Sequence, residues 1–186
     1  MKRVFNSCFL VLVIVIFAST SFAAEWGEQK VATPVLITSV GQSPDALMVK
    51  VLLKRLKLDF TYDNMAKADV VGQFKSIIMV VGFSGKGLGA AQISKKDEIE
   101  RAERLLDEAK AKNVTVVMAH IGGKARLGAG SNHLVDMVAS KSDYLVYVSD
   151  AEVEPVFRKM IDKYNLPAKS APKISSTASV FKELYQ

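Results

Sequence analysis

Two glycine-rich stretches hold the residues of this chain that are best able to bind or transform a ligand. They span residues 82–93 and 120–130 and contain eight of the eleven glycines. Glycine allows backbone amides to approach a ligand closely and to form anion-binding concavities. Lys86 in the first stretch, with Lys124 and Arg126 in the second, adds positive charge. The combination predicts a site for a small anionic compound, such as a carboxylate or a phosphate; the alternative is two flexible loops with solvated basic side chains.

A third and shorter segment, residues 39–43, belongs to the same hypothesis. It follows a predicted strand and ends where a helix is predicted to begin, and the free amides of a helix start favour an anion. Gly41 and Ser43 would bind the anion through backbone amides, and Ser84 and His120 would donate directional hydrogen bonds; His120 could instead anchor its own loop. The ligand-binding candidates are therefore Gly41, Ser43, Ser84, Lys86, His120, Lys124 and Arg126.

A catalytic alternative uses the same side chains. Ser84, His120 and Asp150 each follow a predicted strand, so a serine, histidine and acid set for a hydrolase or transferase is conceivable. Residues 82–86 nevertheless miss the nucleophile-elbow pattern, because Lys86 stands at the fifth position and no helix is predicted to begin at once. We therefore favour binding over catalysis and leave any reaction open.

The sequence predicts no cofactor and no metal. Glycines 85, 87 and 89 match neither the dinucleotide fingerprint nor the phosphate-binding P-loop. A flavin is disfavoured because Phe83 is the only aromatic residue in the candidate loops. Two histidines, and no cysteine besides Cys8, are too few soft ligands for zinc or copper, and the acidic residues lack calcium-loop spacing.

Five apolar segments that alternate with helical patterns must position these loops. The predicted strands cover about residues 34–39, 58–62, 76–81, 114–119 and 144–148. Continuously apolar strands are typical of a parallel sheet that helices cover on both faces. We expect an α/β fold with a single doubly wound parallel sheet of about five strands, flavodoxin-like or Rossmann-like, in a three-layer α/β/α sandwich. Right-handed crossovers favour the flavodoxin-like order 2-1-3-4-5, and ligands bind beyond the carboxyl ends of such strands.

The longest predicted helix begins with a capping box at Ser94 and ends near Lys112. Its predicted inner face consists of Ile99, Ala102, Leu106 and Ala109. Glu100 with Arg104, and Glu108 with Lys112, are four residues apart and can form ion pairs on the outside. The charges of this helix are therefore predicted to form a solvated face.

Residues 1–23 differ from the rest of the chain. Lys2 and Arg3 precede an apolar run of about 11 residues, and Ser21 and Ala23 have the spacing that a signal peptidase reads. A bilayer needs roughly 20 apolar residues, so we expect a cleaved signal peptide, with a retained anchor as the alternative. The expected layout is a signal peptide (1–23), a flexible segment (24–33), an α/β domain (34–167) and a C-terminal segment with a short helix (168–186). Export to the periplasm or the extracellular space follows.

Charge and cysteine content limit the partners. Cleavage would remove Lys2 and Arg3, which lowers the formal charge from +6 to +4, too weak and scattered to indicate nucleic acid. It would also remove Cys8, so the mature chain could form no disulfide. We expect a small anionic molecule as partner and no stable membrane span after cleavage. A protein partner remains the alternative, with the chain as an accessory subunit of an envelope complex.

Three segments carry a resemblance to a known family. Residues 85–91 (GKGLGAA), 120–126 (HIGGKAR) and 142–146 (SDYLV) resemble an uncharacterised family of secreted bacterial proteins that has only a domain-of-unknown-function label. The resemblance extends over roughly residues 34–167. It implies a secreted bacterial protein with one α/β domain, and it carries no catalytic residue over to this chain.

Overall fold

A computed structural model describes Trp26 and residues 29–186 of the chain. The predicted signal peptide and Cys8 lie outside the described residues. Six parallel strands form one sheet in the order β2-β1-β3-β4-β5-β6. In chain order the strands are β1 (Val35–Val40), β2 (Phe60–Tyr62), β3 (Ser76–Val81), β4 (Thr115–His120), β5 (Tyr144–Val148) and β6 (Ala168–Ala171). The expected parallel α/β sheet and the flavodoxin-like order of its first five strands are confirmed.

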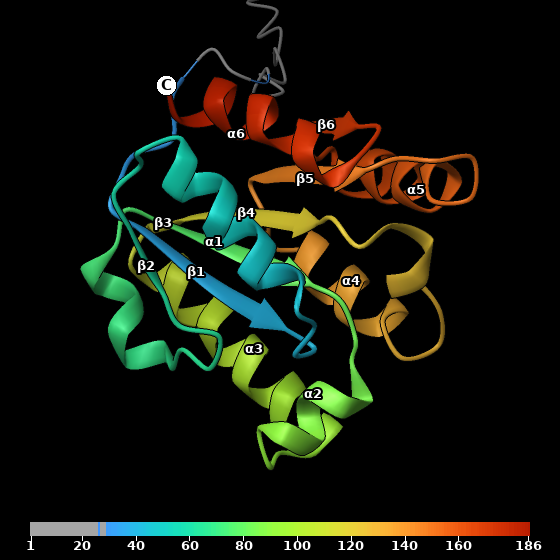
Figure 1. Cartoon of the computed structure of the whole chain (residues 1–186). Coiled ribbons are helices and arrows are strands. Elements are labelled where there is room, and N and C mark those ends of the chain that lie inside the picture. The colour runs from blue at the N-terminus through green and yellow to red at the C-terminus, as the bar shows by residue number, and fades with distance from the viewer. Residues whose placement is uncertain (1–25, 27–28) are drawn as a thin grey trace, which may run out of the picture.

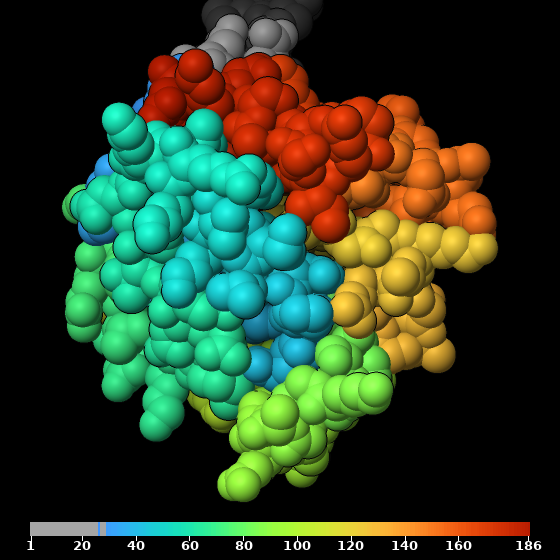
Figure 2. Space-filling model, viewed as in Figure 1, coloured from blue at the N-terminus to red at the C-terminus, as the bar shows by residue number. Residues whose placement is uncertain are grey.

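Helices cover both faces of the sheet (Figure 1). The helices are α1 (Asp45–Arg55), α2 (Gly85–Ala90), α3 (Lys95–Ala111), α4 (Asn132–Ala139), α5 (Glu154–Tyr164) and α6 (Thr177–Tyr185), with short 3-10 turns η1 (Ala68–Gln73), η2 (Gly123–Arg126) and η3 (Ile174–Ser176). One apolar cluster joins the sheet to α1 and α6, which lie side by side on the face seen in Figure 2. The other cluster joins it to η1, α3, α4 and α5, which completes the three layers.

The strands are apolar on both faces because each face is covered. Successive residues of β3 alternate between the two clusters: Ile77 and Met79 pack toward α3, while Ile78 and Val80 pack toward α1. All six residues of β3 are buried. This burial explains the unbroken apolar run in the sequence, since a half-exposed strand would alternate with polar residues.

The sixth strand differs from the expectation of about five. Residues 168–171 read Ala-Lys-Ser-Ala, and this polar segment pairs with β5 at the edge of the sheet. An edge strand of four residues needs little apolar surface, which is why hydrophobic patterning did not reveal it. The closing helix α6 then packs against β5 and β6, with Phe181 and Leu184 fully buried. Within the described part of the chain, no helix has the length and apolar character to cross a membrane.

Candidate functional site

The candidate loops meet at one edge of the sheet, beyond the carboxyl ends of β1, β3 and β4. The loops after β1 and β3 are joined directly: the amide of Gly82 donates to the carbonyl oxygen of Val40 at 2.9 Å, and the amide of Ser84 donates to Gly41 at 2.8 Å. Gly41 has a φ of 93°, which favours glycine. Backbone hydrogen bonds therefore hold the loop after β1 directly against the loop after β3.

The Gly41 amide, expected to bind a ligand, already has an acceptor. It donates to Glu98 Oε1 at 2.7 Å, and the same carboxylate oxygen accepts from Gln42 Nε2 at 3.2 Å. Glu98 is almost fully buried on α3. A carboxylate of the protein itself thus occupies the position that the sequence assigned to the anion of a ligand.

Glu98 forms a buried pair with Arg101 that the sequence did not reveal. Arg101 donates to Glu98 from Nε at 2.9 Å and from Nη2 at 2.8 Å. Its remaining guanidinium donors have three acceptors. Two lie at the end of β1, the Thr38 hydroxyl and the Ser39 carbonyl oxygen, and the third is the carbonyl oxygen of Ala66, just before η1. All five donors of the guanidinium therefore have acceptors.

The prediction of a solvated charged face on this helix is wrong for Glu98 and Arg101. The expected outer pairs do form, with both Glu100–Arg104 and Glu108–Lys112 at 3.8 Å. Glu98, however, stands four residues before Ala102 and so lies on the buried stripe of the helix. That spacing is the signal that could have identified it.

Asp45 and Arg126 form a second pair over the ends of β3 and β4. Asp45 is the first residue of α1, and its Oδ2 lies 3.4 Å from Arg126 Nε. This geometry does not make a hydrogen bond, so Oδ2 is a buried atom without a hydrogen-bond partner among the described residues. The Arg126 side chain is 27% exposed and the Asp45 side chain 10%. The Arg126 side chain makes no hydrogen bond within the described residues, so its terminal amino groups remain free to act as donors.

Two glycines make room for this pair. A Cβ on Gly122 would lie 2.1 Å from Arg126 Cγ and 2.4 Å from Asp45 Oδ2. A Cβ on Gly82 would lie 3.2 Å from the same carboxylate oxygen and 2.9 Å from Ser43 Oγ. Ser43 is buried, and its Oγ accepts a hydrogen bond from the Asp45 amide at 3.3 Å. The glycine pattern therefore serves to bring the arginine and the carboxylate together.

His120 lies beneath this edge and is fully buried. Its Nδ1 is 3.0 Å from the carbonyl oxygen of Val81, and its Nε2 is 3.2 Å from that of Gly123. Burial lowers the pKa of His120, although the two carbonyl oxygens and the charge of Asp45 act in the opposite direction. His120 thus anchors the loop after β4 to β3.

Residues 85–90, expected as part of a loop, form the short helix α2, which projects next to the loop after β1 (Figure 2). Ser84 caps this helix, because its Oγ accepts from the Gly87 amide at 3.1 Å. Gly87 permits close packing, since a Cβ there would lie 1.9 Å from the Gln42 carbonyl oxygen. Lys86 is exposed and has no ion-pair partner in the described residues.

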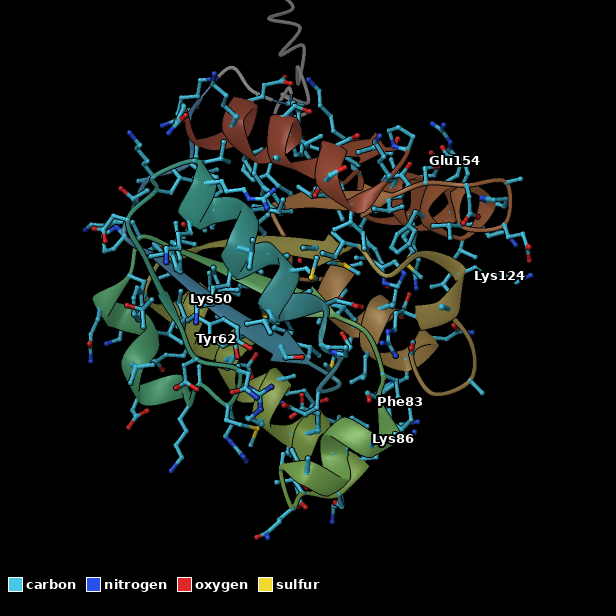
Figure 3. All side chains as sticks on the ribbon, in the orientation of Figure 1. Lys50, Tyr62, Phe83, Lys86, Lys124 and Glu154 are labelled. Carbon is cyan, nitrogen blue, oxygen red and sulfur yellow. The ribbon has the colours of Figure 1, made fainter. Side chains whose placement is uncertain are left out.

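Lys124 and Asp150 have partners of their own. Lys124 Nζ lies 2.5 Å from Glu152, in an exposed pair well apart from Lys86 (Figure 3). Asp150 Oδ1 accepts from the amides of Glu152 and Val153, both at 2.9 Å, and these hydrogen bonds lower the pKa of Asp150. No hydrogen bond in the described part of the chain joins Ser84, His120 and Asp150. No group of acidic, histidine or cysteine residues able to hold a metal occurs there either.

Comparison with known proteins identifies a family and no activity. A solved structure of the esterase AlinE4, in a mutant form, shares 11% identity with this chain, with 82% of this chain and 81% of that one covered and a TM-score of 0.30. A likeness this weak transfers no function. No functionally curated protein matches the sequence. Residues 32–185 match the family described as "Domain of unknown function (DUF6305)", so the chain belongs to the DUF6305 family.

Proposed function

We propose that this chain is an exported protein that binds a small anionic metabolite at the carboxyl edge of its sheet, with Arg126 as the main recognition group. The observation that carries the proposal is the pairing of a half-buried guanidinium with free terminal donors and a buried carboxylate that fixes only its Nε side. The charged start and apolar run of residues 1–23 support export.

Arginine suits this role because its planar fork binds a carboxylate or a phosphate through two parallel hydrogen bonds. Asp45 and Gly122 hold the side chain in one place, which reduces the entropy lost when a ligand binds. Partial burial also strengthens the attraction between the Arg126 guanidinium and an anionic ligand, because the guanidinium lies in a lower dielectric than bulk water. Lys86 and Lys124 would add only long-range attraction, because both are exposed.

The test is a thermal unfolding screen of the purified protein against organic acids, phosphates, sugars and nucleotides. A ligand at about 100 times its Kd adds roughly 2.7 kcal/mol, which raises the Tm of a domain of this size by several degrees. We expect a shift confined to one class of anion. A screen without any shift would contradict the proposal.

Variants then assign the site. Arg126→Ala should weaken the binding of any hit at least about tenfold, because a hydrogen bond to a charged group contributes about 1.5–3 kcal/mol. Arg158→Ala is the matched control, since Arg158 is an exposed arginine that pairs with Glu154 on α5. Equal affinity of both variants and the parent chain would show that Arg126 does not bind the ligand.

A second candidate function is a protein-interaction module. Leu47, Met48 and Val51 are 48%, 44% and 39% exposed on α1, an apolar group that nothing in the described chain covers. Exposed apolar patches mark interaction surfaces. A partner retained by the immobilised protein, and lost from a Leu47→Glu/Val51→Glu variant that stays folded, would favour this function over metabolite binding.

A further inference from the structure

A cavity of about 260 Å³ lies away from the Asp45–Arg126 pair, between the connection after β2 and the first turns of α3. These two segments lie next to each other (Figure 1), and η1 packs along α3. Met65 and Ala68 line the cavity on one side, and Ile93 lines it from the turn that precedes α3. The interior is therefore largely apolar.

Arg101 also lines this cavity, but hydrogen bonds fix its side chain and Glu98 balances its charge. Its guanidinium donates all its hydrogen bonds to Glu98, to the end of β1 and to Ala66. It consequently has no donor left for a ligand, and its charge is balanced by Glu98 at 2.8 Å. A preformed apolar space with few polar groups at its mouth is typical of a small-molecule site.

The mouth of the cavity carries two cations. Lys67 is exposed and has no ion-pair partner among the described residues, and Arg104 is paired only loosely, with Glu100 at 3.8 Å. Asp97 also lines the cavity, but its carboxylate accepts hydrogen bonds from the Ser94 amide at 2.9 Å and the Ser94 hydroxyl at 2.7 Å. These hydrogen bonds lower the pKa of Asp97 and keep it ionised, so Lys67, Arg104 and Asp97 together carry a net charge of +1.

We propose that this cavity binds a small aliphatic monocarboxylate, with its chain against Met65, Ala68 and Ile93 and its carboxylate between Lys67 and Arg104. The volume of 260 Å³ corresponds to about nine water-sized groups, which matches a chain of about six to eight carbons. Longer chains do not fit inside, and shorter ones leave apolar surface uncovered.

Octanoate is the probe, and titration calorimetry with the full chain is the measurement. Each methylene removed, from octanoate through hexanoate to butanoate, should weaken binding about fourfold. 1-Octanol, which keeps the chain and lacks the charge, should bind more weakly than octanoate. Absence of octanoate binding up to about 10 mM, or equal binding of the alcohol, overturns the proposal.

Variants test the location. Ala68→Phe fills the cavity and should abolish octanoate binding, and Met65→Trp serves the same purpose if the first variant does not fold.

Lys67→Ala/Arg104→Ala should weaken binding about five- to tenfold. Lys96→Ala/Lys110→Ala is the matched control, because it removes two exposed cations of α3 outside this cavity and should leave the affinity unchanged. Arg126→Ala should also leave it unchanged, which separates this site from the one proposed above. Octanoate binding that survives in a folded cavity-filling variant overturns the assignment.

Discussion

Glu98–Arg101 and Asp45–Arg126 are arginine–carboxylate pairs at the same edge of the sheet, yet they leave different groups free. Both side chains of the first pair are at most 9% exposed, and every guanidinium donor has an acceptor. In the second pair Arg126 is 27% exposed and approaches Asp45 only with Nε. The first pair therefore fixes the loop after β1, whereas the second retains donors for a ligand.

This difference shows where function should be sought in a fold of this kind. Buried charges are costly unless hydrogen bonds satisfy them, so a fully satisfied pair is part of the scaffold. In the second pair the buried Asp45 Oδ2 has no hydrogen bond, and a buried acceptor left without a partner costs about 1–3 kcal/mol. Gly82 and Gly122 leave the space that Asp45 and Arg126 occupy, because a Cβ at either position would contact Asp45 Oδ2.

Removing one partner of the closed pair should have the largest effect. Glu98→Ala leaves the Arg101 guanidinium buried without its counter-charge and the Gly41 amide without its acceptor. We expect a loss of about 3–5 kcal/mol in the free energy of unfolding, measured by urea denaturation. Glu100→Ala, which breaks only exposed pairs on the same helix, should cost about 0–1 kcal/mol. Similar losses for both variants would show that the closed pair is not part of the scaffold.

Crowding the open pair should have a smaller effect. In Gly122→Ala the new methyl group would meet Arg126 Cγ at 2.1 Å and Asp45 Oδ2 at 2.4 Å, so the arginine must move. We expect a loss of about 1–3 kcal/mol in urea denaturation, together with weaker binding of any anion found in the screen.

The same substitution at Gly89 is the control for Gly122→Ala. Gly89 lies in α2, and a methyl group added there would meet no neighbouring atom within 4 Å, so alanine should stabilise the chain by about 0.4–1 kcal/mol. If Gly122→Ala were as harmless as Gly89→Ala, the close contact between Gly122 and Arg126 would be disproved.

The histidine beneath the open pair should make stability depend on pH. Burial lowers the pKa of His120 in the folded chain, while an unfolded histidine titrates near 6.5. Below about pH 6.5 the unfolded chain binds the extra proton first, so stability falls with decreasing pH until the folded histidine is protonated as well.

Urea denaturation at pH 8 and pH 5.5 measures this dependence. His120→Gln should remove the part of the pH dependence that comes from this residue, whatever the variant costs at pH 8. The exposed His133 is the control, and His133→Gln should keep the dependence of the parent chain. An unchanged dependence in His120→Gln would mean that His120 has similar pKa values in the folded and unfolded chains.

The elements of the fold could be predicted because burial leaves a direct pattern in the sequence. β3 and β5 coincide with apolar runs that end at polar or glycine residues. α3 begins at its capping box. β6 left no such pattern, because its polar residues lie at an edge. α2 was hidden by its glycines, since glycine is a poor helix former and only the Ser84 cap and the contact of Gly87 with Gln42 explain its presence there.

The strand topology predicted which edge of the sheet holds the candidate site. It did not predict which amides and side chains at that edge are already hydrogen-bonded within the protein. Parallel strands bring their carboxyl ends together, which places Gly41, Ser84 and Arg126 at one edge. Whether an amide is free depends on side chains far along the chain, such as Glu98, which is 57 residues from Gly41. The spacing of residues within the loops contains no information about such a contact.

Lys124 should show the smallest effect, and it tests whether every cation of this edge matters equally. Its pair with Glu152 is exposed, with side-chain exposures of 64% and 60%. A double-mutant cycle of Lys124→Ala and Glu152→Ala should give a coupling of about 0–1 kcal/mol that decreases as salt is added. Affinity for an anion should also fall less in Lys124→Ala than in Arg126→Ala, because Lys124 and its partner Glu152 are both exposed and an ammonium group lacks the planar fork of arginine. A coupling above about 1 kcal/mol that persists at high salt would instead make Lys124–Glu152 a second fixed pair beside Glu98–Arg101.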